Sequence, residues 1–310
     1  MEPQKKLLMI VNPRAGRSKP RGPLYDAAAA FCDAGYTLCI RRTAAAGDAR
    51  RIAENEGGGY DTVVAVGGDG TLNEVVSGLM TITPEKRPEL GYIPSGSTND
   101  FASSLGLPKN MRKAAQTAAL GKPFLVDVGI FGKNRYFVYV AAFGAFTEVS
   151  YSTPQETKNI LGHQAYMLEA IKRLTGLKSY RMRLTWEHLG EQRELEEEFI
   201  LGMVTNTTSI GGFKGLVGMD VALDDGEFEV LLVRKPRTPL DIASIAAYLI
   251  QREGENECVF KFRTSKLTVQ SEELVDWSLD GEFGGSQTEV VIENKPREIA
   301  IRVPEVTVRG

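Results

Sequence analysis

Residues 63–74 of this 310-residue chain read VVAVGGDGTLNE, an apolar run that breaks into glycines around a single aspartate. The run Val63–Val66 has no polar member, which is typical of a strand buried on both faces of a parallel sheet. Apolar residues then recur with helical spacing over residues 72–79. A glycine-rich turn between a strand and a helix lets main-chain N–H groups approach an anion. The stretch therefore predicts a phosphate-binding loop.

The same loop departs from two common nucleotide-binding motifs. Asn73 stands where G-x-G-x-x-G requires its third glycine, and the chain contains no G-x-x-x-x-G-K-[ST]. A carboxylate next to a phosphate would be repelled, so Asp69 is best explained by a divalent cation or a ribose hydroxyl close by. The alternative is that the glycines serve only a tight turn.

Bulk properties narrow the class of protein. The length allows two domains, and 42% hydrophobic with 25% charged residues is typical of a soluble globular chain. A net charge of −3 argues against bulk nucleic-acid binding. Three cysteines without metal-ligand spacing indicate a reducing cytoplasm. No apolar stretch approaches the roughly 20 residues of a membrane span, so we expect any lipid contact to be peripheral.

Strand and helix patterns alternate over the first 120 residues. The predicted strands are 7–11, 36–40, 63–66 and 90–93, and the predicted helices are 24–32, 48–56 and 72–79. This alternation predicts a parallel sheet with helices on both faces, whose ligands lie outside the carboxyl ends of the strands. The loops after the first, third and fourth strands carry the polar and glycine residues that would lie there.

Beyond residue 121, short strands separated by turn residues predominate and predict an antiparallel sandwich or barrel. The predicted strands are 126–130, 136–142, 180–186, 199–205, 228–233, 259–262, 266–270, 289–292 and 299–303. Two helical patterns interrupt them, at 164–174 and 240–251. We expect a domain boundary near residue 125 and a cleft between two closely coupled domains.

Two further loops carry polar side chains after strands. Residues 12–17 read NPRAGR, which is either a helix-capping turn or the border of a nucleotide, with Arg14 or Arg17 near its phosphates. With Lys19 and Arg21 this segment could also contact an anionic headgroup. Residues 95–100 read SGSTND and contain more capping side chains than one helix start requires. They could bind phosphates and a metal opposite the first loop.

Two Asp-Gly pairs lie in the second half of the chain. Asp225-Gly226 is a hairpin turn or a site for a structural cation. Asp280-Gly281 is followed by Glu282, and a carboxylate on this hairpin could accept the hydroxyl proton that phosphoryl transfer to an alcohol releases. The sequence leaves open whether Asp280 or Glu282 is that base.

Four motifs carry a resemblance to a known family: VGGDGTLNE at residues 66–74, Pro94 with GSTNDF at residues 96–101, DDG at residues 224–226 and LDGE at residues 279–282. In this order they resemble the soluble bacterial diacylglycerol kinases and the related sphingosine and ceramide kinases. The first motif alone is also similar to that of NAD kinases and, distantly, of phosphofructokinases. The resemblance covers nearly the whole chain. It implies a nucleotide-binding α/β domain of the phosphofructokinase and NAD-kinase type over residues 1–125. It implies a lipid-binding β-sandwich domain over residues 126–310, and the last residues of the chain are candidates for packing against the first domain again.

The resemblance also implies roles for individual residues. Glu282 would be the proton acceptor, with Asp280 beside it. In the mechanism that we expect from the residues themselves, the metal of the nucleotide binds through Asp69, with Asp100 as a further candidate ligand. A structural magnesium would use Asp225 with the carbonyl groups of Ala222 and Glu227. Ser97 stands where the family usually has threonine, and Ser103 where it often has arginine. The implied nucleotide contacts are Asn12, Pro13, Arg14, Ala15, Gly16, Thr43, Gly67, Gly68, Asp69, Gly70, Thr71, Leu72, Asn73, Glu74, Ser97 and Thr98.

The expected function is transfer of the γ-phosphoryl group of ATP, with Mg²⁺, to the hydroxyl of a lipid, with diacylglycerol as the first candidate. A kinase of a soluble acceptor such as NAD and a non-catalytic nucleotide-binding regulatory protein are the alternatives. We expect a cytoplasmic protein that contacts the inner face of the membrane peripherally and binds no nucleic acid. A homodimer is left open.

Overall fold

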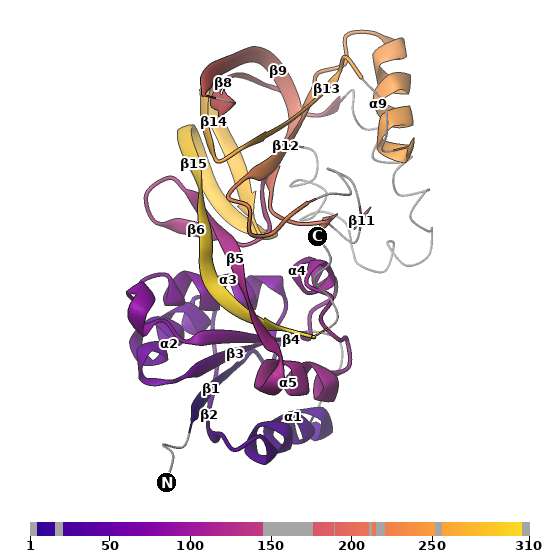
Figure 1. Ribbon diagram of the computed structural model, residues 1–310. Helices are drawn as coiled ribbons and strands as arrows, with labels where there is room; N and C mark the ends of the chain where they lie inside the picture. Colours follow the sequence, from indigo (N-terminus) through magenta and orange to yellow (C-terminus); the bar gives the residue numbers. More distant parts are fainter. Residues whose placement is uncertain are drawn as a thin grey trace.

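The computed structural model describes residues 5–15, 21–144, 176–188, 190–210, 213–214, 221–251 and 256–305 (Figure 1). The helix expected at 164–174 lies outside these residues, as do Gly16, Arg17 and Lys19. Within the described part of the chain, no helix is both long and apolar enough to cross a membrane.

A parallel four-stranded sheet forms the first part of the chain, in the order β2-β1-β3-β4 (Figure 1). Alternate residues of its strands enter two different cores: Leu8 and Ala65 pack with α2 and α3, whereas Met9 and Val66 pack with α1 and α5. Helices therefore cover both faces, as the strand-helix alternation predicted. The strands are β1 (Lys6–Val11), β2 (Thr37–Arg42), β3 (Thr62–Gly67) and β4 (Glu89–Pro94).

Sequence reasoning located most of the helices but missed α5. Its four buried alanines gave only a weak apolar signal, although Asn110 caps it by accepting the Lys113 N–H at 3.1 Å. The helices are α1 (Arg21–Asp33), α2 (Asp48–Glu56), α3 (Asp69–Leu79), α4 (Asp100–Ser104) and α5 (Met111–Leu120), with short 3-10 turns η1 (Gly57–Gly59) and η2 (Pro84–Lys86).

The second part of the chain is rich in antiparallel strands. Helix α9 (Pro239–Gln251) agrees with the second helical pattern, and β10 and β11 form a separate small pair. The strands are β5 (Lys122–Phe131), β6 (Arg135–Phe137), β7 (Val140–Gly144), β8 (Tyr180–His188), β9 (Glu191–Thr205), β10 (Ser209–Ile210), β11 (Phe213–Lys214), β12 (Phe228–Arg234), β13 (Val259–Thr264), β14 (Lys266–Leu279) and β15 (Glu282–Val303).

Two predicted strand boundaries were wrong. The strand expected at 136–142 is divided into β6 and β7, because the backbone N–H groups of residues 138–140 bind the Asp280 carboxylate instead of a neighbouring strand. The two strands expected at 289–292 and 299–303 are one 22-residue strand, β15. The ladder with β5 shifts register between Lys295 and Ile299, and this bulge accommodates Pro296.

Strand β15 connects the two parts of the molecule (Figure 1). Its first half pairs with β14, and its last residues pair with β5 and, through Ile301 and Leu90, with β4. One 13-stranded sheet therefore runs through both parts. The β-rich part has its own aromatic core, in which Trp277 lies 5.0 Å from Phe143 and 5.2 Å from Phe131 between ring centroids.

Helices α2 and α3 pack so closely at Gly78 that a side chain there would have no room. A Cβ atom on Gly78 would lie 2.8 Å from Ala53 Cβ and would also meet the Arg50 carbonyl. We expect Gly78→Ala to lower the free energy of unfolding in urea by about 2 kcal/mol, despite the better helix propensity of alanine. Gly59→Ala is the control, because no atom lies within 4 Å of its Cβ position. Equal stabilities of the two variants would contradict this packing.

Candidate active site

The glycines that follow β3 and β4 pack against each other at the carboxyl edge of the parallel sheet. A Cβ atom on Gly68 would lie 3.3 Å from Gly96 Cα, and one on Gly96 would lie 2.6 Å from Gly68 Cα. Ser95 N–H donates to the Gly67 carbonyl at 2.7 Å. These glycines therefore bring the two loops into contact, and they also leave the backbone accessible to a ligand.

Asp69, the first residue of α3, holds the two loops together. Its Oδ2 accepts the backbone N–H of Asp100 at 3.0 Å, and Asp100 is the first residue of α4. Burial, together with the nearby carboxylates of Asp100 and Asp280, raises the pKa of Asp69 to about 7 against the opposing N–H donors. A buried carboxylate with two further carboxylates nearby is suited to binding a cation.

Tyr92 lies beneath this carboxylate and was missed in the sequence. Its hydroxyl is 3.4 Å from Asp69 Oδ1 and 3.4 Å from Asn99 Oδ1. Burial raises the pKa of Tyr92 well above its usual range, and Asp69 raises it further, so the phenol stays protonated and can donate a hydrogen bond. The available signal was a hydroxyl-bearing residue in an otherwise apolar strand, because a buried tyrosine usually finds a polar partner.

Asp280 has all of its acceptor capacity in use. Its Oδ1 accepts the N–H groups of Tyr139 and Val140 at 3.0 Å each, and its Oδ2 accepts Val138 N–H at 2.8 Å and Asn73 Nδ2–H at 2.7 Å. The residue is 2% exposed and has a left-handed backbone, with φ of 50°. Burial raises its pKa to about 6, against the effect of these donors. Asp280 thus connects the hairpin to α3 and to the segment between β6 and β7.

Glu282 is the freer of the two hairpin carboxylates. It is the first residue of β15 and keeps access to solvent, and its Oε1 lies 3.0 Å from the position that a Cβ atom on Gly70 would occupy. Partial burial and the charge of Glu74 raise its pKa. The fold thus brings Glu282 to the residue beside Asp69, although about two hundred residues separate them in the sequence.

Several expected nucleotide contacts gather at the same edge of the sheet. Asn12 donates from Nδ2 to Thr71 Oγ1 at 2.9 Å and accepts Arg14 N–H at 3.0 Å, which joins the loops after β1 and β3. Thr43 is buried beside them, with its N–H on the Val11 carbonyl at 2.9 Å. Ser97 and Thr98 are exposed on the loop after β4. Pro13 and Arg14 are exposed and Ala15 is partly buried.

Three of the residues expected to contact the nucleotide have side chains that make contacts within the protein. Leu72 is fully buried in the core, so its side chain does not reach a ligand. Glu74 accepts the N–H groups of Gly47 at 2.8 Å and Ala49 at 3.0 Å, which orders the start of α2. Asn73 donates to the Tyr136 carbonyl at 2.8 Å as well as to Asp280.

The expected structural magnesium does not fit the arrangement around Asp225. Its Oδ1 accepts Glu227 N–H at 3.0 Å, and its Oδ2 forms an ion pair with Arg263. The Arg263 guanidinium also lies 3.5 Å from a Glu227 oxygen and 3.4 Å from a Glu229 oxygen. A cation bound by Asp225 would have to displace this guanidinium.

The acidic residues of the active site fit a magnesium ion better. Across the described residues, no group of three or more His, Cys, Asp or Glu side chains is arranged to hold a metal. Magnesium, however, is usually held by one or two carboxylates together with substrate phosphates and water. Asp69 and the buried Asp100, next to the glycine loops, match that pattern.

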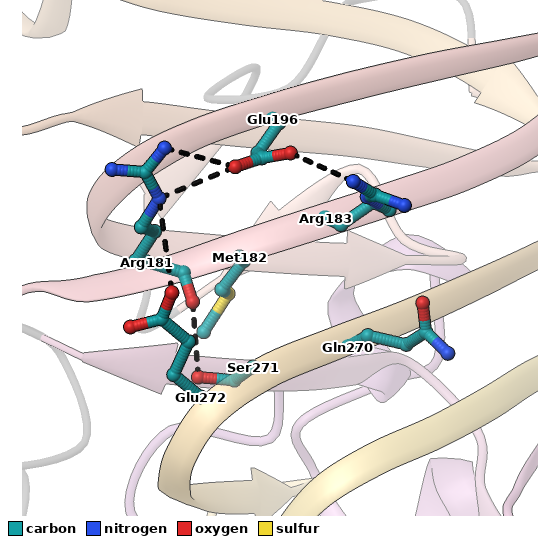
Figure 2. A pocket seen from close by; sticks show the side chains of 7 residues that line it. All are labelled: Arg181, Met182, Arg183, Glu196, Gln270, Ser271 and Glu272. Carbon is teal, nitrogen blue, oxygen red and sulfur yellow. Dashed lines mark hydrogen bonds and ion pairs between the residues drawn. The ribbon is translucent and has the colours of Figure 1, made fainter.

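A hollow on the outer face of β8, β9 and β14 has balanced charges (Figure 2). Arg181 and Arg183 point toward Glu196 from either side, at 2.9 Å and 3.1 Å, as Figure 2 shows. Because their charges are paired with Glu196, these two arginines give little support to a contact with anionic lipid at this hollow.

Comparison with known proteins identifies the family. The sequence profile of the diacylglycerol kinase catalytic domain matches residues 6–131. A diacylglycerol kinase of Bacillus subtilis is 34% identical over 91% of both chains, and one of Staphylococcus aureus is 33% identical over 91% of this chain and 87% of its own. The crystal structure of a Bacillus anthracis diacylglycerol kinase superposes with a TM-score of 0.79 at 26% identity, covering 98% of this chain and 99% of that one. The chain belongs to the diacylglycerol kinase family.

Proposed function

We propose that the protein transfers the γ-phosphoryl group of ATP to a lipid hydroxyl, with diacylglycerol as acceptor and phosphatidic acid as product. The names of its relatives support this acceptor. The observation that carries the proposal is the approach of Glu282 to Gly70, which brings a carboxylate with solvent access to the residue next to Asp69. Phosphoryl transfer to an alcohol requires a proton acceptor next to bound phosphates.

In this mechanism the acceptor hydroxyl oxygen attacks the γ-phosphorus. The bond from that phosphorus to the bridging oxygen of ADP breaks, and the hydroxyl proton passes to Glu282. The glycine loop at residues 67–70 positions the phosphates through main-chain N–H groups, and the exposed hydroxyl groups of Ser97 and Thr98 on the facing loop are further contacts. Asp69 and Asp100 would hold Mg²⁺, which neutralises the charge on the phosphates when bound.

The same geometry supports Glu282 over Asp280 as the base. Asp280 accepts four hydrogen bonds from the protein and is nearly inaccessible. A proton transferred to either oxygen would disrupt that set of contacts. Glu282 is exposed, so an acceptor hydroxyl can reach it.

The proposal includes the organisation of the chain around this site. The nucleotide-binding domain is residues 1–125 of the phosphofructokinase and NAD-kinase type, and the lipid-binding β-sandwich domain is residues 126–310. Support comes from the α/β and β-rich parts of the fold, each of which has a core cluster of its own, in addition to a third cluster that the two parts share. A cytoplasmic protein with peripheral contact to the membrane is part of the same proposal.

Incubation of the protein with labelled ATP and vesicles containing diacylglycerol, ceramide, sphingosine or phosphatidylglycerol tests the acceptor. NAD is included as the soluble acceptor, and products are identified by mass. We expect phosphatidic acid as the main product. A phosphorylated NAD would favour the soluble-acceptor kinase, and ATP binding without any product would favour the non-catalytic alternative.

Glu282→Gln is expected to lower kcat by about 1,000-fold while ATP binding is retained, since only the proton acceptor is lost. Glu289→Gln, an exposed position on the same strand, is the control and should keep full activity. Asp280→Asn is expected to lose stability together with activity, because an amide cannot accept all four donors. An active Glu282→Gln with a folded but inactive Asp280→Asn would instead assign the base to Asp280.

Asp69→Asn is expected to abolish turnover and to raise the free energy of unfolding at about pH 8 by about 2 kcal/mol. The folded pKa of Asp69 is about 7, whereas an unfolded aspartate titrates near about 3.9. The folded wild type therefore binds more protons between these values, and its stability falls as the pH rises through them. The advantage of the variant should shrink as the pH is lowered toward about 4.

Urea unfolding between these pH values measures the effect. Asp26→Asn, which changes an exposed aspartate on α1, is the matched control and should show no such dependence. A constant difference between Asp69→Asn and wild type across the range would contradict the elevated pKa.

A further inference from the structure

We propose that Tyr92 is a positioning residue, whose hydroxyl fixes the orientation of the Asp69 carboxylate toward bound Mg²⁺ and ATP. This inference rests on the proposed function, in which Asp69 works at the phosphates. Tyr92 itself does not touch the substrate.

The sheet register places Tyr92 beneath the two loops. Tyr92 pairs with Ala65 on β3, two residues before Gly67, and its side chain is 1% exposed. The ring belongs to the core cluster that contains Leu72 of α3 and Phe101 of α4. The ring is thus held by packing, and its hydroxyl reaches the point where the loops after β3 and β4 meet.

The phenol has a single hydrogen and two acceptors within reach. Asn99 Oδ1 already accepts the Gly96 N–H at 2.9 Å, so its need for a donor is met. Asp69 Oδ1, at 3.4 Å, belongs to a buried carboxylate, which gains more from a donor than a neutral amide does. The hydroxyl of Tyr92 therefore donates its hydrogen bond to Asp69.

Contacts from two different elements then fix the plane of the carboxylate. The backbone of α4 contributes Asp100 N–H, which donates to Oδ2 at 3.0 Å, and Phe101 N–H as a further donor, whereas the phenol of β4 faces Oδ1. A carboxylate bound at one oxygen alone can rotate about its terminal torsion, which has a broad energy profile. A group that holds reacting phosphates contributes most when such rotation is already restricted.

The test compares Tyr92→Phe with Tyr36→Phe. Tyr36 is likewise buried and donates its hydroxyl hydrogen to the Ala119 carbonyl at 3.3 Å, but it lies in the core around α1 and α5. The readouts are kcat, KM for the lipid, and the affinity for Mn²⁺ in the presence of ATP, measured by electron paramagnetic resonance without lipid.

We expect Tyr92→Phe to weaken Mn²⁺ binding and to lower kcat by about tenfold each, which is the size of one hydrogen bond to a charged group. KM for the lipid should stay unchanged. Tyr36→Phe should change stability to a similar extent but leave Mn²⁺ binding and kcat as in wild type. An unchanged Mn²⁺ affinity in Tyr92→Phe would overturn the proposal.

A double-mutant cycle then separates positioning from a general effect on the core. If Tyr92 acts through Asp69, adding Tyr92→Phe to Asp69→Ala should not weaken Mn²⁺ binding further. An equal loss in both backgrounds would show that Tyr92 does not act through this carboxylate. If wild type binds Mn²⁺ and ATP but phosphorylates no lipid, the proposed function fails while the binding cycle still decides the role of Tyr92.

Discussion

The carboxylate of Asp280 joins the parts of this molecule on which the active site depends. It accepts backbone N–H groups from residues 138–140 of the β-rich part and a side-chain N–H from Asn73 on α3 of the α/β part. These contacts end β6, allow β7 to begin, and set the hairpin that carries Glu282 beside Gly70. A buried ionised group is costly unless it is well bonded, so the four donors make this contact specific.

The sequence predicted local features well and long-range ones poorly. The periodicity of residues 48–56 and 72–79 located α2 and α3, because one face of each helix is buried. Helix α5 escaped because alanine gives little apolar contrast. The motifs predicted Asp69 and Glu282 as site residues. Only the fold shows that Glu282 lies next to Gly70 and that the Asp280 carboxylate accepts hydrogen bonds from backbone N–H groups. In the sequence Tyr92 looks like one more residue of an apolar strand, because the hydrogen-bond partner of its hydroxyl is set by the packing of two loops.

The ionised form of three carboxylates in the candidate site is disfavoured, because burial raises the pKa of Asp69, Asp280 and Glu282. The energy for this comes from the apolar packing on either side of the sheet and from the aromatic core around Trp277. Such strain at a site is common where a protein must bind charged ligands.

Because of the path of β15, the residues that the family profile matches are not all the residues that the α/β part needs in order to fold. The family profile ends at residue 131, yet in the sheet β15 lies between β4 and β5 and pairs with both. A chain that stopped there would leave the edge of β4 open and β5 without its main partner, and open edges of this kind promote aggregation. During synthesis the α/β part must therefore wait for almost the whole chain to emerge before its sheet can be completed.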